Sequence, residues 1–178
     1  MSRPQPPEPA KLVIGLLLKE RGSVSAPARM LSDAFGPIDT VSPWLPFDYT
    51  DYYAAEMDGP LFRRMFAFNR LIAQSDLAHI KRCTNDIEKK YSRNGKRDVN
   101  IDPGYLMRER FVLATGKNYS HRIYIGKGIY ADLTLIYRKG GFHALEWTYP
   151  DYADTYVQDF LQRVRKRNVM QLKRKTRL

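Results

Sequence analysis

The stretch from Arg97 to Gly141 constrains the fold most, because it holds the densest series of strand signals in the chain. Three runs rich in apolar residues follow one another here, with glycine-containing turns between them, at 105–115, 120–126 and 129–138. Strand-length runs divided by short glycine turns are typical of antiparallel hairpins. The stretch therefore predicts an antiparallel β-meander.

The turn Gly126-Lys127-Gly128 sets the register of the second hairpin. If these three residues form the whole loop, Ile125 lies opposite Ile129, and the pairs that follow are Tyr124–Tyr130, Ile123–Ala131 and Arg122–Asp132. Side chains alternate between the faces of a strand. One face is then an apolar core face made by Ile123, Ile125, Ile129, Ala131, Leu133 and Leu135. The other holds Arg122, Tyr124, Tyr130, Asp132 and Thr134, and is either a solvated face with a supporting ion pair or the wall of a site.

The rest of the chain alternates strand and helix signals. From Lys11 to Asp102 the order is strand, helix, strand, strand, helix, strand, with elements expected at 11–19, 26–35, 38–42 with 47–53, 61–72, 76–92 and up to 102. This βαββαβ order is that of ferredoxin-like folds. A further strand is expected at 142–148 and an amphipathic C-terminal helix at 154–167. The sequence predicts one α+β domain, ferredoxin-like in order and extended by the meander.

Composition divides the chain into three parts. Four prolines in residues 1–10 predict a disordered lead, and residues 11–167 are long enough for one domain with a core. Residues 161–178 carry eight lysines and arginines and no acid, which is most of the net charge of +11. Residues 168–178 are therefore expected to be a basic flexible tail, and 163–177 could contact nucleic acid.

Two features predict a cytoplasmic protein with no membrane segment. The apolar run 12–18 is too short to span a bilayer, and a proline-rich lead replaces the basic start of a signal peptide. The single cysteine, Cys83, excludes an internal disulfide and fits a reducing compartment.

Acidic and histidine side chains near the meander are the candidate catalytic groups. Asn100 and Asp102 lie two apart and share a face, so they suit a ligand pair at a strand end, or alternatively an Asx turn before Pro103. His121 could act as a general acid or base, because histidine side chains ordinarily titrate near neutral pH. It alternates in step with the core-face residues Ile123 and Ile125, which equally predicts a buried, hydrogen-bonded histidine. Asp132 completes the candidate catalytic set of Asp102, His121 and Asp132.

The remaining candidates would bind the ligand. Lys117 and Arg122 suit phosphate, Arg122 in a bidentate manner. Glu88, on the 76–92 helix, could join Asp102 and Asp132 in holding a divalent cation such as Mg²⁺, although a solvated helix face is the simpler reading. Asn100 and Tyr130 complete the candidate binding set.

Several segments resemble a bacterial family catalogued as domain of unknown function 4416. The match is carried by FGPID at 35–39, TNDIE at 84–88, RDVNIDPGY at 97–105, GIYADLTL at 128–135 and WTYPDY at 147–152, and it extends in matching order from Lys11 to about Arg167. The resemblance implies no particular activity or catalytic residue. Some members of the family carry a label as GTP-binding proteins.

The sequence excludes a P-loop GTPase. A P-loop requires G-x-x-x-x-G-K-[ST] after a strand, so that backbone N–H groups hold the phosphates. The Gly-Lys pairs here begin at 95, 116 and 126; none has a glycine five residues earlier, and none is followed by Ser or Thr. Nucleotide binding by another route stays open.

Three functions fit these residues. The first is binding of a phosphorylated or other anionic ligand in a polar cleft beside the meander, with catalysis undecided; an enzyme here would perform metal-assisted phosphoryl transfer or hydrolysis. The second is nucleic-acid binding through the basic tail and the tyrosines. The third is a noncatalytic scaffold domain.

Overall fold

The computed structural model describes residues 2–48, 57, 60–93 and 95–175. Within this part, one nine-stranded sheet contains β1 (Ala10–Leu18), β2 (Ile38–Val41), β3 (Leu45–Phe47), β4 (Leu61–Ile72), β7 (Val99–Leu106), β8 (Arg110–Thr115), β9 (Arg122–Gly126), β10 (Ile129–Arg138) and β11 (Gly141–Ala144). A separate small hairpin pairs β5 (Ser92–Arg93) with β6 (Lys96–Arg97). The α-helices are α1 (Ser25–Phe35), α2 (Leu77–Lys90), α3 (Pro150–Ala153) and α4 (Thr155–Lys175), and the 3-10 turns are η1 (Arg21–Val24) and η3 (Gln74–Asp76).

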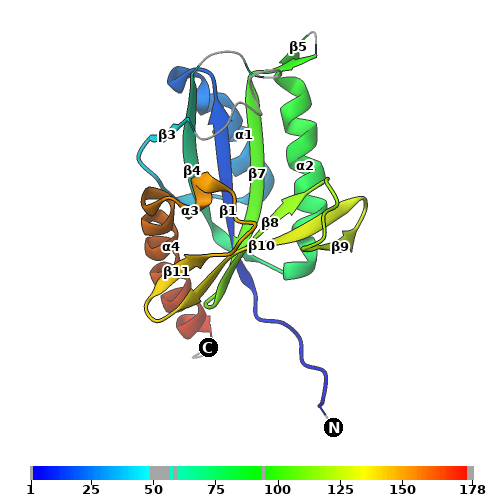
Figure 1. Ribbon diagram of the computed structural model, residues 1–178, viewed down its shortest axis with the longest axis vertical. Coiled ribbons are helices and arrows are strands. Elements are labelled where there is room, and N and C mark those ends of the chain that lie inside the picture. Colours follow the sequence, from blue (N-terminus) through cyan, green and yellow to red (C-terminus); the bar gives the residue numbers. More distant parts are fainter. Residues whose placement is uncertain (1, 49–56, 58–59, 94, 176–178) are drawn as a thin grey trace.

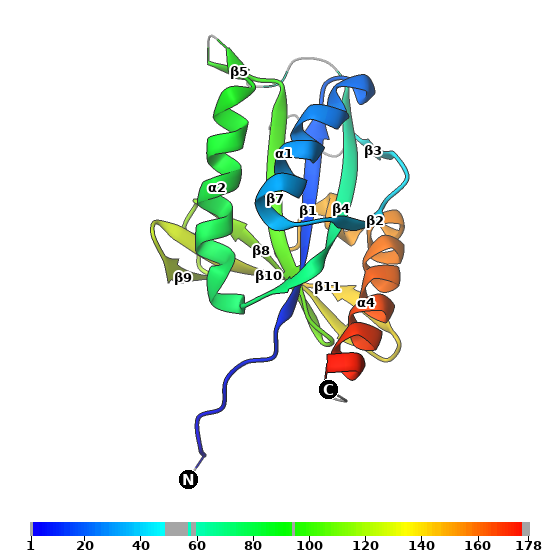
Figure 2. The ribbon, with the colours of Figure 1, turned by 180° about the vertical axis from the view of Figure 1, so that it is seen from behind.

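The large sheet is antiparallel and has helices on both faces (Figure 1). Its order is β11-β10-β8-β7-β1-β4-β2, with β3 also paired to β4 and β9 to β10. Figure 2 shows α1 and α2 together on one face, where they bury Leu12, Ile14 and Leu16 of β1. Val13 of β1 lies in the other core with residues of α4. Because side chains alternate along a strand, β1 is buried on both faces and forms the centre of the domain.

The predicted elements are largely present, with corrections near the meander. The run 105–115 is not one strand: β7 ends at Leu106, and a turn leads into β8 at Arg110. The strand expected at 142–148 ends at Ala144, because Thr148 Oγ1 accepts a hydrogen bond from the Leu145 N–H and closes a turn. Of the segment expected to be extended at 47–53, residues 49–53 lie outside the described part of the chain.

The register of the second hairpin is confirmed except at its turn. Three of the predicted pairs are present, including Arg122 opposite Asp132. A bulge places Ile129 opposite Gly126 instead of Ile125. The predicted core face is wrong at Ile123, whose side chain is 71% exposed. In the described residues β9 pairs only with β10, so it is an edge strand.

The C-terminal helix is longer than the sequence predicted. α4 continues to Lys175, so the flexible tail expected at 168–178 is wrong for residues 168–175. Asn168 and Leu172 are buried, and Gln171 accepts a hydrogen bond from the fully buried Lys11 Nζ at 3.0 Å. Before β1, residues 2–9 form no helix or strand, and Glu8 forms an ion pair with Arg108 at 3.1 Å. No helix in the described residues is long and apolar enough to cross a membrane.

The buried end of α4 makes Leu172 a test of this correction. We expect Leu172→Ala to lower the free energy of unfolding by about 2 kcal/mol or more, because it removes a buried side chain and leaves a cavity. Met170→Ala is the matched control, since Met170 lies on the same helix with 57% exposure. Chemical denaturation measures both. Equal, small losses would show that the end of α4 contributes nothing to the core.

Candidate functional site

A cleft of about 1020 Å³ opens where β7 and β8 diverge. The two strands pair only from Gly104–Leu106 with Phe111–Leu113. Beyond Gly104, β7 continues toward Val99 along β1, while β8 turns away with β10 and β9 (Figure 1). The cleft lies in this fork, with α2 contributing one wall and the segment 149–152 another. We call it the fork cleft.

The fork cleft brings together most of the predicted site residues. It is lined by Glu88, Asn100, Asp102, Lys117, Arg122 and Asp132. His121 and Tyr130 do not line it. The sequence therefore located the cleft, although the contacts below give several of these side chains a role within the fold.

Asn100 and Asp102 face the fork cleft from β7. Asn100 Nδ2 donates to Asp102 Oδ2 at 2.8 Å, and Arg97 donates to Asn100 Oδ1 at 2.9 Å. Because Asp102 lies inside a strand, the alternative of an Asx turn is wrong. Its side chain is 25% exposed, more than the other carboxylates that line the cleft. Asp102 is thus the carboxylate most accessible to a ligand.

Arg63 is a functional candidate that the sequence analysis missed. This buried side chain of β4 forms ion pairs with Asp151 at 2.5 Å and Asp102 at 3.9 Å. Its guanidinium lies over the rings of Phe47 and Tyr152, 5.0 and 4.9 Å from their centroids. Burial raises the pKa of Asp151, and the charge of Arg63 opposes that rise. Alternation along the strand could have identified it, because Arg63 lies on the same face of β4 as the core residues Met65 and Ala67.

Glu88 and Lys81 of α2 hydrogen-bond to the edge of β7 where β8 no longer pairs with it. Glu88 Oε1 accepts the Ile101 N–H at 2.5 Å, and Lys81 Nζ donates to the Ile101 carbonyl at 2.8 Å. Ile101 pairs with β1 on its other side and lies beyond the last β8 pair, so these side chains replace a strand partner. The prediction that Glu88 binds ligand is weakened, because one of its carboxylate oxygens already holds the strand.

The burial of Glu88 predicts a pH-dependent effect of Glu88→Gln. Burial raises the pKa of Glu88 above its ordinary value of 4.5. The folded state therefore holds this proton more tightly than the unfolded chain, and ionisation costs stability as pH rises from about 4.5 through the raised pKa. We expect the stability of the wild type relative to Glu88→Gln to fall over that interval, as measured by denaturation at several pH values.

Asp86→Asn provides a control of opposite sign on the same helix. Lys89 lowers the pKa of this exposed carboxyl through a hydrogen bond and its charge. The free energy of unfolding of the wild type, relative to that of Asp86→Asn, should therefore increase slightly as pH rises. If the stability of the wild type relative to Glu88→Gln instead increased with pH, the raised pKa of Glu88 would be contradicted.

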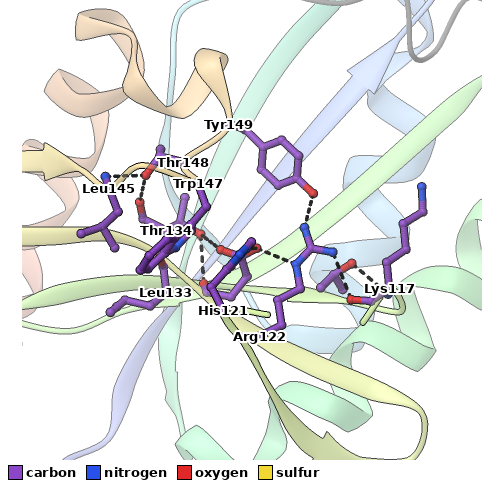
Figure 3. A network of polar contacts seen from close by, with 11 residues as sticks. Lys117, His121, Arg122, Leu133, Thr134, Leu145, Trp147, Thr148 and Tyr149 are labelled. Carbon is purple, nitrogen blue, oxygen red and sulfur yellow. Dashed lines mark hydrogen bonds and ion pairs between the residues drawn. The ribbon is translucent and has the colours of Figure 1, made fainter. Parts of the chain in front are cut away.

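Asp132 and its ion-pair partner Arg122 form the centre of a polar network on the meander. Figure 3 shows Arg122 among Lys117, His121 and Tyr149. The buried Asp132 accepts from Arg122 Nε at 2.9 Å and from Thr134, and His121 Nε2 lies 3.2 Å from its Oδ2. Arg122 also donates to the Lys117 carbonyl at 3.0 Å and to the Tyr149 hydroxyl at 2.6 Å. Arg122 therefore joins the 116–121 loop and the segment after β11 to the sheet. In this arrangement Asp132 and Arg122 position cleft walls.

His121 is held between aromatic rings outside the fork cleft. Its ring stacks on Trp147 with centroids 4.9 Å apart and planes 10° apart, and Tyr119 lies 5.3 Å away. Trp147 donates to the Leu133 carbonyl at 2.8 Å, which fixes the indole. With its side chain only 10% exposed, His121 fits the buried, hydrogen-bonded alternative better than a catalytic role.

The segment Trp147–Tyr152 closes one side of the fork cleft. Thr148 donates to the Thr134 carbonyl at 2.6 Å, and Tyr152 stacks on Phe111 with centroids 5.7 Å apart. Burial raises the pKa of Tyr149, and the charge of Arg122 beside it acts in the opposite direction. This segment places Tyr149 and Asp151 along the cleft because its contacts fasten it to β10 and β8.

The acidic residues do not assemble as a metal site. No group of three or more His, Cys, Asp or Glu side chains that could hold a metal ion occurs among the residues that the structure describes. The trio of Glu88, Asp102 and Asp132 expected to hold a divalent cation is therefore not formed. Asp132 and Glu88 are instead engaged by Arg122 and by the edge of β7.

Four of the five motifs that carried the family resemblance contribute residues to the fork cleft, and the motif at 35–39 does not. Residues 8–168 match the family described as Domain of unknown function (DUF4416). The chain belongs to this family. Searches among curated proteins and among solved structures gave no match. Family membership explains the shared motifs and leaves the activity to be inferred from the site.

Proposed function

We propose that this DUF4416 protein binds a small phosphate-bearing anion in the fork cleft. The observation that carries the proposal is the charge of the lining. Lysines and arginines outnumber carboxylates there by six to four, as Arg63, Lys81, Lys89, Arg97, Lys117 and Arg122 against Glu88, Asp102, Asp132 and Asp151. A concave site with an excess of cations favours an anion, and phosphate is the anion that clustered lysines and arginines suit best.

The size of the fork cleft supports a ligand of nucleotide or sugar-phosphate dimensions. Ligand sites of small molecules typically enclose about 300–1,000 Å³, and this cleft has about 1020 Å³. Its walls combine cationic groups with the rings of Tyr119 and Tyr149, which suit the nonionic part of such a ligand. If the protein catalyses a reaction of its ligand, Asp102 is the side chain we expect to accept a proton, because it is the most exposed of the cleft carboxylates.

The architecture that presents the cleft also supports the finer fold assignment. The order β7-β1-β4-β2, with α1 and α2 on one face, is what a ferredoxin-like unit would have, and it supports that assignment. We infer that the meander extends this unit at the β7 edge. The buried Val157, Phe160 and Leu161 on α4 support an amphipathic C-terminal helix.

Nucleic-acid binding through residues 163–177 has less support. Arg165 Nε donates to the Arg108 carbonyl at 2.5 Å, and its guanidinium lies 3.4 Å from the centroid of the Tyr137 ring. Arg167 forms an ion pair with Asp39 at 3.3 Å. These arginines help to pack α4 on the sheet, which reduces the positive charge available to a polyanion.

A thermal-shift comparison tests the proposed function. Nucleoside monophosphates and sugar phosphates should raise the melting temperature, whereas the matching nucleosides and sugars should not. A ligand at about 100 times its Kd adds about 2.7 kcal/mol to the free energy of unfolding, which is readily detected. Failure of every phosphorylated compound to act more strongly than its unphosphorylated counterpart would refute the proposal.

Lys117→Ala localises the binding to the fork cleft. Lys117 is exposed in the loop after β8, so its replacement should leave the fold unchanged while weakening phosphate-compound binding about tenfold. Lys166→Ala, which removes one exposed charge from α4, should leave binding unchanged. Equal effects of the two substitutions in calorimetric titrations would show that binding reflects overall charge and not this site.

A further inference from the structure

A strongly basic rim borders the fork cleft at the end of α2. Five lysines and arginines occur in residues 89–97 with no acid among them: Lys89, Lys90, Arg93, Lys96 and Arg97. They come from the last turn of α2 and from the β5–β6 hairpin, which projects beyond the sheet in Figure 1. We call these five residues the basic rim.

The nearby acidic residues neutralise only part of the charge of the basic rim. Two of them pair with a rim residue, and a third pairs with Lys19 outside the rim. Asp98 forms an ion pair with Lys19 at 3.2 Å, and Asp86 pairs with Lys89 at 2.8 Å. Glu88 is buried, accepts a hydrogen bond from the Ile101 N–H and forms an ion pair with Arg97 at 3.6 Å. The basic rim therefore keeps an excess of positive charge at the surface, and Lys90 and Arg93 within it are exposed.

The basic rim is continuous with the fork cleft. Lys89 and Arg97 belong to both, and the cleft extends from them to the exposed rings of Tyr119 and Tyr149, which are 66% and 43% accessible. A run of cations leading to accessible aromatic rings is the surface that single-stranded nucleic acids use, because phosphates contact the cations and unstacked bases stack on the rings.

We propose that the basic rim extends the binding surface of the fork cleft to a single-stranded nucleic acid. The backbone would lie along the β5–β6 hairpin, and one nucleotide would enter the cleft. A duplex fits this surface less well, because its bases are already stacked and cannot reach the tyrosines. This inference rests on the proposed function, since the nucleotide in the cleft is held there by the same phosphate-binding groups.

Fluorescence anisotropy with a short fluorescein-labelled thymidine oligonucleotide tests the inference. The variant Lys90→Ala/Arg93→Ala changes two exposed residues that do not line the cleft. We expect it to weaken oligonucleotide binding about tenfold or more at low salt, and to reduce the salt slope by about 0.7 per charge removed. Binding of adenosine monophosphate, measured by calorimetry, should be unchanged.

The control variant is Lys166→Ala/Lys173→Ala, which removes two exposed charges from α4. It should leave oligonucleotide binding within about twofold of the wild type. Equal losses in both double variants, or tighter binding to a duplex or to anionic phosphatidylserine vesicles than to the single strand, would overturn the inference. Failure of the proposed function is seen separately, when no nucleoside monophosphate or sugar phosphate stabilises the wild-type protein more than its unphosphorylated counterpart does.

Discussion

Gly104→Ala is expected to lower the free energy of unfolding by about 3 kcal/mol. A Cβ at this position would lie 2.5 Å from the Val112 carbonyl oxygen and 2.9 Å from Cζ of Phe111. The first contact is with backbone of the paired strand, so β7 and β8 must move apart for alanine to fit. Gly104 is opposite Leu113 in the last pair before the fork. The substitution should therefore damage both stability and ligand binding.

Gly22→Ala is the control for Gly104→Ala. A Cβ on Gly22 would meet no atom within 4 Å, so the change should alter stability by no more than about 0.5 kcal/mol. Denaturant unfolding compares the two variants, and the calorimetric titration reports the cleft. A Gly104→Ala protein as stable as Gly22→Ala would mean that the strands are not in the close contact on which the fork depends.

Arg63→Met is expected to cost about 3 kcal/mol or more at neutral pH. The substitution keeps an apolar chain in the buried space but leaves Asp151 without the cation that lies 2.5 Å away. Burial already raises the pKa of Asp151 against the influence of Arg63. Loss of Arg63 should raise that pKa further, so the cost in the variant should shrink as pH falls toward the ordinary value of 3.8, where the carboxyl is protonated.

The double variant Arg63→Met/Asp151→Asn separates charge from packing. Removing both charges should restore part of the stability that Arg63→Met loses, because no unpaired buried carboxylate remains. Asp159→Asn, at an exposed position on α4, should have little effect in either background. A double variant less stable than the sum of its single changes would show that Asp151 does not depend on Arg63.

The sequence predicted contacts that depend on local periodicity. The Arg122–Asp132 pair followed from alternation and a glycine turn, which act within one hairpin. The split between β7 and β8 was missed because the turn at 107–109 contains neither Gly nor Pro. The end of α4 was misplaced because basic residues mask the apolar spacing that runs from Val164 to Leu172.

The cleft chemistry required tertiary contacts that no local pattern encodes. Arg63 and Asp151 meet only because α3 packs across the sheet from a distant part of the chain. Burial also changed the roles of predicted residues, as Asp132 and Glu88 bind protein partners. Asp102, Asn100 and Lys117 were placed in the cleft correctly, since each follows from its strand or turn position.

NMR chemical-shift mapping with adenosine monophosphate tests the central claim most directly. On isotope-labelled protein, we predict that the amides that shift are those of residues 100–102 on β7, 113–119 on β8 and its following loop, and 149, 151 and 152, because these segments line the fork cleft. Adenosine should leave them unchanged. Shifts confined to α4, or scattered over the surface without this cluster, would contradict a phosphate-binding site between β7 and β8.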